Sequence, residues 1–80
     1  MDYSEVVSER ILEYCKQKNI TVNKLASLSG INQSTVDNII KKKTKIPNLR
    51  TIHRLSQGIG VTVSEFLDFQ KMNETIFDEE

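Results

Sequence analysis

The chain has 80 residues, eleven acidic and eleven basic side chains, and one cysteine. This length accommodates one domain, and Cys15 has no second cysteine with which to form an internal disulfide. No apolar run is long enough to span a bilayer. The N-terminus lacks the basic start and apolar stretch of a secretory signal, so we expect a cytoplasmic protein.

The charges are segregated along the sequence although they cancel overall. Residues 1–15 carry one basic and four acidic side chains, residues 16–54 carry nine basic and one acidic, and residues 55–80 carry one basic and six acidic. This pattern indicates a polyanion-binding middle between acidic ends, although a merely solvated basic surface would give the same distribution.

Five helices are predicted, and the first covers residues 4–18 and ends at Asn19. The second is short, with Thr21 as its N-cap and Gly30 just past its end. In both, apolar residues recur at helical spacing, and we expect these side chains to face the core. They are Val7, Ile11, Tyr14 and Cys15 in the first helix, and Leu25, Ala26 and Leu28 in the second.

Three further helices are predicted. The third begins at Asn32, the fourth at Asn48, and the fifth at a capping box formed by Thr62 and Glu65. A basic loop over residues 41–47, closed by Pro47, separates the third helix from the fourth. The residues expected to face inward are Val36, Ile39 and Ile40, then Leu49, Ile52, Leu55 and Ile59, then Val63, Phe66 and Leu67.

The remaining residues, 68–80, form an acidic tail in which Phe69, Met72 and Ile76 lie at helical spacing. This stripe allows a short helix with two possible roles. It packs on its own domain, or it joins the fifth helix in a dimer contact.

Two short helices joined by a tight turn at Gly30 form a helix-turn-helix unit. The second helix of such a unit enters the major groove of DNA and presents its N-terminal residues to base edges. Here those residues are Gln33, Ser34 and Thr35, followed one turn later by Asn38. Thr35 is expected to cap the helix or touch a phosphate, and the basic loop is placed to follow the DNA backbone.

The run from Ile11 to Leu67 resembles the lambda-repressor/Cro-type (XRE-family) helix-turn-helix domain. The matching pieces are Leu25-Ala26 with Ser29-Gly30, then Ile31 through Val36, Lys43 through Pro47, and Gly60-Val61 with Glu65-Phe66-Leu67. The resemblance implies an all-α, compact five-helix domain, here residues 4–67. It also implies a regulator of transcription, expected to be a repressor, that binds double-stranded DNA as a homodimer.

The resemblance also assigns roles to individual positions. Base contacts are implied for Gln33, Ser34 and Asn38, and contacts to the DNA backbone for Thr21, Lys41, Lys43 and Lys45.

The sequence departs from the family pattern at three places. Val22 replaces a glutamine that touches phosphate, Cys15 and Ile40 replace a buried arginine–glutamate pair, and Lys42 stands where a glycine usually follows the third helix. A left-handed conformation at Lys42 would cost about 1–2 kcal/mol. The alternatives are that the third helix continues through Lys42 or that the loop has a different conformation.

The sequence bears on two other classes of function. A protein-interaction adaptor or antitoxin-like module would use the same fold and bind its partner protein through the tail. An enzyme is disfavoured because the chain has one histidine, one cysteine and no phosphate-cradling glycine loop. We expect no cofactor, no metal and no small-molecule substrate, and we interpret His53 as a surface residue and Cys15 as a core residue.

Overall fold

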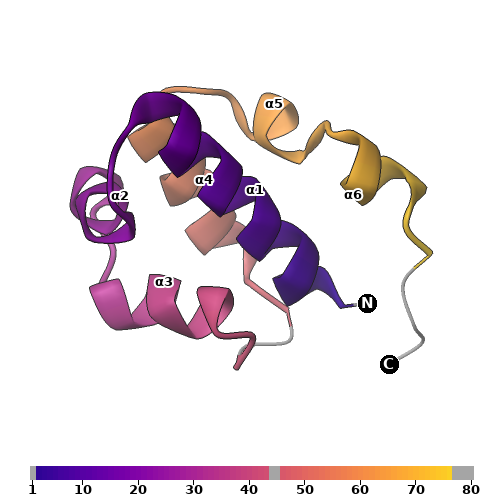
Figure 1. Ribbon diagram of the computed structural model, residues 1–80, viewed down its shortest axis with the longest axis horizontal. Coiled ribbons are helices and arrows are strands. Elements are labelled where there is room, and N and C mark those ends of the chain that lie inside the picture. Colours follow the sequence, from indigo (N-terminus) through magenta and orange to yellow (C-terminus); the bar gives the residue numbers. More distant parts are fainter. Residues whose placement is uncertain (1, 44–45, 77–80) are drawn as a thin grey trace.

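The computed structural model describes residues 2–43 and 46–76, and all its regular elements are α-helices (Figure 1). They are α1 (Tyr3–Lys18), α2 (Val22–Ser29), α3 (Gln33–Ile40), α4 (Leu49–Ile59), α5 (Val63–Leu67) and α6 (Gln70–Glu74). The all-α prediction is confirmed. The helix count is six rather than five because the first part of the tail forms α6.

Most of the helices begin at a polar N-cap residue whose side chain accepts a hydrogen bond from the first turn, as the sequence predicts. Thr21, Asn48 and Thr62 each accept a hydrogen bond from a backbone N–H three residues later, at 3.0, 2.8 and 3.1 Å. The Thr62 N–H in turn donates to the Glu65 carboxylate, so the predicted capping box is present. Asn32 occupies the N-cap position of α3 but makes no side-chain capping bond.

Left-handed residues end three of the helices. Gly30 and Gly60 have φ values of 67° and 91° after α2 and α4, and Asn19 has φ 55° after α1. Asparagine is the residue after glycine that best tolerates this conformation, so Asn19 ends α1 as predicted.

The core lies between α1, α2, α3 and α4, and α5 closes it with Phe66. Its buried members are Val7, Ile11, Cys15, Leu25, Ala26, Val36, Ile39, Ile52, Leu55, Ile59 and Phe66. Tyr14, Ile40, Val63 and Leu67 are half-buried and pack against it, as expected of inward-facing residues.

Two residues expected in the core are exposed instead. Leu28 is 51% exposed, because the face of α2 that meets α4 is completed by Ser29, which lies directly against Gly58. Leu49 is 71% exposed, because it is the first residue of α4 and precedes the part of that helix that packs, which begins at Ile52. Helical spacing identifies a face, but the neighbouring helix decides which residues on that face it covers.

The tail packs on its own domain through α6, which lies beside α1 (Figure 1). The Lys71 ammonium lies 2.8 Å from a Glu9 carboxylate oxygen, and Met72 packs against the core. Ile76 is 93% exposed, so the last residue of the predicted stripe takes no part in this packing.

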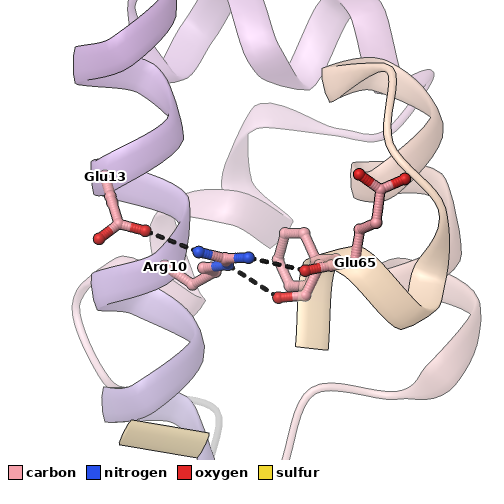
Figure 2. A network of polar contacts seen from close by, with 4 residues as sticks. Arg10, Glu13 and Glu65 are labelled. Carbon is pink, nitrogen blue, oxygen red and sulfur yellow. Dashed lines mark hydrogen bonds and ion pairs between the residues drawn. The ribbon is translucent and has the colours of Figure 1, made fainter. Parts of the chain in front are cut away.

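Arg10 joins α1 to α5 and to the start of the tail. Its guanidinium donates to the carbonyls of Phe66 and Glu65 at 2.8 and 2.7 Å and pairs with Glu13 at 2.8 Å (Figure 2). It also lies 4.6 Å from the centre of the Phe69 ring, a cation–π arrangement. These carbonyls belong to the last turn of α5, where helical acceptors lack intrahelical partners. Arg10 therefore fixes the C-terminal end of α5.

Candidate nucleic-acid interface

The turn between α2 and α3 is held by backbone hydrogen bonds. The N–H of Ile31 donates to the Ala26 carbonyl at 3.1 Å, across the left-handed Gly30. The chain then enters α3 at Gln33, two residues beyond Ile31. This short connection couples the orientation of α3 to that of α2, which is the arrangement predicted for a helix-turn-helix unit.

One face of α3 is buried and the other is open to solvent. Val36 and Ile39 are 0% and 1% exposed and hold the helix against the core. Gln33, Ser34 and Asn38 are all exposed. The structure therefore brings the three predicted base-contacting residues onto the outer face of one helix, and a helix of this kind fits the major groove of B-DNA.

Four of the residues predicted to contact the DNA backbone are described, at the start of α2, in the first turn of α3 and directly after α3. Thr21 is exposed and caps α2 through its Oγ1 atom, which still carries a hydrogen that can donate to a phosphate. Thr35 is half-buried in the first turn of α3. Lys41 and Lys43 are exposed directly after α3, whereas Lys45 lies outside the described residues.

The turn after α3 keeps a left-handed residue although no glycine is present. Lys42 has φ 62°, its N–H donates to the Ile39 carbonyl at 3.0 Å, and the Lys43 N–H donates to the Asn38 carbonyl at 2.8 Å. This pair of bonds is the Schellman pattern of helix ends. The helix therefore does not continue through Lys42: α3 ends at Ile40, and a left-handed turn follows it.

The other three positions that depart from the family pattern pack in or against the hydrophobic core. Val22 is half-buried and packs against the core, so its position contributes a hydrophobic contact. Cys15 is buried and Ile40 half-buried against the same core, where an arginine and a glutamate were expected from the family. Burial raises the pKa of the Cys15 thiol, which favours its neutral form.

Other residues considered for chemistry do not gather into a site. His53 is exposed, as predicted, on α4. Within residues 2–43 and 46–76, no three histidine, cysteine or acidic residues are grouped so as to hold a metal ion. In the same ranges, no helix has the length and apolar character needed to cross a membrane.

The role of Ser4 is not evident from the sequence. Its side chain is completely buried in α1, and its hydroxyl donates to the Ile39 carbonyl of α3 at 3.1 Å. A serine beside the apolar stripe of α1 was the only available signal, and such a signal does not identify a partner 35 positions away.

Comparison with known proteins assigns the chain to a family. Residues 10–72 match the sequence profile of the Cro/C1-type HTH DNA-binding domain. Among solved structures, the crystal structure of the prophage Lp1 protein 11 is similar, with a TM-score of 0.82 and 38% sequence identity over 94% of this chain and 100% of that one. None of the curated proteins compared with the chain matches it. The chain belongs to the Cro/C1-type helix-turn-helix family of DNA-binding domains.

Proposed function

We propose that this protein is a sequence-specific transcriptional regulator, acting as a repressor, that reads the major groove of duplex DNA with α3. The observation that carries the proposal is the division of α3 into a buried apolar face and an exposed polar face bearing Gln33, Ser34 and Asn38. Glutamine and asparagine amides can each pair with two groups on the edge of adenine. The family supports duplex DNA as the partner.

Exposed basic residues, the nearest in sequence directly after α3, supply the contacts that do not depend on base sequence. Lys41, Lys42 and Lys43 follow it directly and are exposed. Arg50 and Arg54 are also exposed, on α4. Lysines near phosphates release counterions on binding, so affinity for any duplex should fall steeply with salt, with a slope of about −0.9 per phosphate contact.

A homodimer on a two-fold symmetric site fits the size of the domain. Its longest extent is 33 Å, and half-sites one helical turn apart are separated by roughly 34–36 Å. Two copies on adjacent turns would therefore lie close enough to touch. Bound over a promoter, such a dimer would act by occupying the DNA.

Selection of bound duplexes from a random pool, at two salt concentrations, tests the proposal. We expect an enriched two-fold symmetric motif with half-sites about 10 base pairs apart. Salt-sensitive binding with no enriched motif would refute sequence-specific reading. If the pool does not bind at either salt concentration, the protein-interaction alternative replaces DNA regulation.

Two substitutions separate base reading from backbone binding. Asn38→Ala should cost about 1–3 kcal/mol on the selected duplex and relax the preference at one base pair. Lys43→Ala should weaken all duplexes alike and reduce the salt slope by about 1 per subunit. Asn73→Ala is the matched control, because Asn73 is an exposed amide on α6. Equal losses on selected and random DNA for Asn38→Ala would contradict its base-reading role.

A further inference from the structure

Ser4 ties the first helix to the end of the helix proposed to read DNA. It lies in the first turn of α1 and is 0% exposed. Its Oγ donates to the Ile39 carbonyl oxygen at 3.1 Å. Asp2 caps α1 by accepting from the Glu5 N–H at 3.0 Å, which fixes the backbone turn that carries Ser4. Ser4 precedes residue 10, where the match to the family begins.

The Ile39 carbonyl receives a second donor from the turn after α3. The Lys42 N–H lies 3.0 Å from the same oxygen, and the Lys43 N–H bonds to the neighbouring Asn38 carbonyl. A carbonyl oxygen has two lone pairs, so the two donors together use its accepting capacity. This one atom therefore joins α1, the last turn of α3 and the lysine turn.

The hydrogen bond from Ser4 to the Ile39 carbonyl matters because α3 is short. It has eight residues, which corresponds to a length of about 12 Å. Its buried side chains, Val36 and Ile39, lie on one face, and their hydrophobic burial is not directional in the way that a hydrogen bond is. Base reading needs side chains held to within about 0.5 Å and 10–20°. A directional bond at the C-terminal end restrains sliding and tilting that would displace Asn38.

We infer that Ser4 is a positioning residue for DNA recognition, and that its hydroxyl fixes α3 and the lysine turn relative to α1. Its contribution to recognition rests on the proposed DNA-reading function. Its hold on the turn does not, because the contact exists without DNA. The two parts can therefore be measured separately.

The test compares Ser4→Ala with Ser56→Ala. Ser56 is buried to the same degree, at 1% exposed, and its hydroxyl also donates to a carbonyl, that of Ile52 at 2.8 Å within α4. Both substitutions delete one buried hydroxyl bond, but only Ser4→Ala deletes a bond to α3. Thermal unfolding of both full-length variants measures how much stability each one loses relative to the wild-type protein.

Two readouts distinguish positioning from general destabilisation. Amide hydrogen exchange at Lys42 and Lys43 should speed up about fivefold in Ser4→Ala, the effect of losing one hydrogen bond, and should stay near wild type in Ser56→Ala at matched stability. Affinity for the selected duplex should fall about three- to tenfold in Ser4→Ala, while affinity for random duplex changes less than about twofold.

Similar exchange and similar affinity ratios in the two variants would overturn the inference. A faster-exchanging turn with undiminished affinity for the selected duplex would overturn the role in recognition. If the wild-type protein selects no sequence at all, the proposed function fails. The exchange comparison then still decides whether Ser4 holds the turn.

Discussion

Replacing Lys42 by glycine should stabilise the protein. Lys42 is held at φ 62° by the two hydrogen bonds that end α3, and a side chain with a β-carbon pays about 1–2 kcal/mol in this left-handed region. Glycine avoids that cost but loses more backbone freedom on folding, by roughly 0.5–1 kcal/mol. Taking the midpoint of each range, the net gain for Lys42→Gly is about 0.75 kcal/mol. In a domain of this size that raises Tm by about 3–6 °C.

The control for this substitution is Lys42→Ala, which removes the same charge and keeps the β-carbon. Because Lys42 is exposed, the lost amine should matter little for folding, and alanine should unfold near the wild-type temperature. Thermal melts followed by circular dichroism, with urea unfolding as a second measure, give the difference between the two variants. That difference reports the backbone alone.

The reasoning would be refuted if Lys42→Gly were no more stable than Lys42→Ala. The backbone would then reach the turn at no cost to lysine, or glycine would lose as much as it gains. Under conditions in which both variants are fully folded, they should bind DNA with the same affinity, because both lose one positive charge directly after α3. A loss confined to Lys42→Gly would show that a rigid turn is needed for binding.

Three further substitutions test contacts between helices. Arg10→Lys should cost about 2 kcal/mol in urea unfolding, because an ammonium lacks the planar fork that reaches both carbonyls at the end of α5; an unchanged midpoint would refute the bridging role. Gly58→Ala should destabilise by about 1–2 kcal/mol, because a Cβ there would lie 2.9 Å from the Cα and N atoms of Ser29. Ser29→Ala should instead stabilise by up to about 1 kcal/mol, since the Ser29 hydroxyl is buried with no hydrogen-bond partner among the described residues; a destabilised Ser29→Ala would contradict that account.

The helix boundaries could be predicted because their causes are local. An N-cap acts on the backbone three residues away, so Thr21, Asn48 and Thr62 carry the information for three helix starts within one turn of sequence. The same holds for the left-handed ends at Gly30 and Asn19. Since α3 begins three residues after Gly30, its candidate base-contacting face could also be predicted from the sequence.

The contacts that join helices could not be predicted in the same way. Ser4 and Ile39 are 35 positions apart, and Arg10 and Phe66 are 56 apart. In each pair the acceptor is a backbone carbonyl, which every residue possesses, so the sequence does not distinguish the partner. Leu28 shows the same limit for packing, because its exposure depends on how closely Gly58 allows α4 to approach α2.

The segregation of charge acquires a meaning once the helices are placed. The basic stretch of the sequence covers the end of α1 together with α2, α3 and α4. Of the acidic residues that the structure describes, all but Asp37 lie on α1, at its N-cap, on α5 and α6, or between these last two helices. In Figure 1, α5 and α6 lie along one side of α1, and α2 and α3 lie on the other. A protein of zero net charge thus has a strong charge asymmetry between its two sides. The field of a polyanion would turn it so that α3 leads and α6 trails. The bond between Lys71 and Glu9 belongs to this arrangement, because it joins α6 to the acidic part of α1 on the side away from α3.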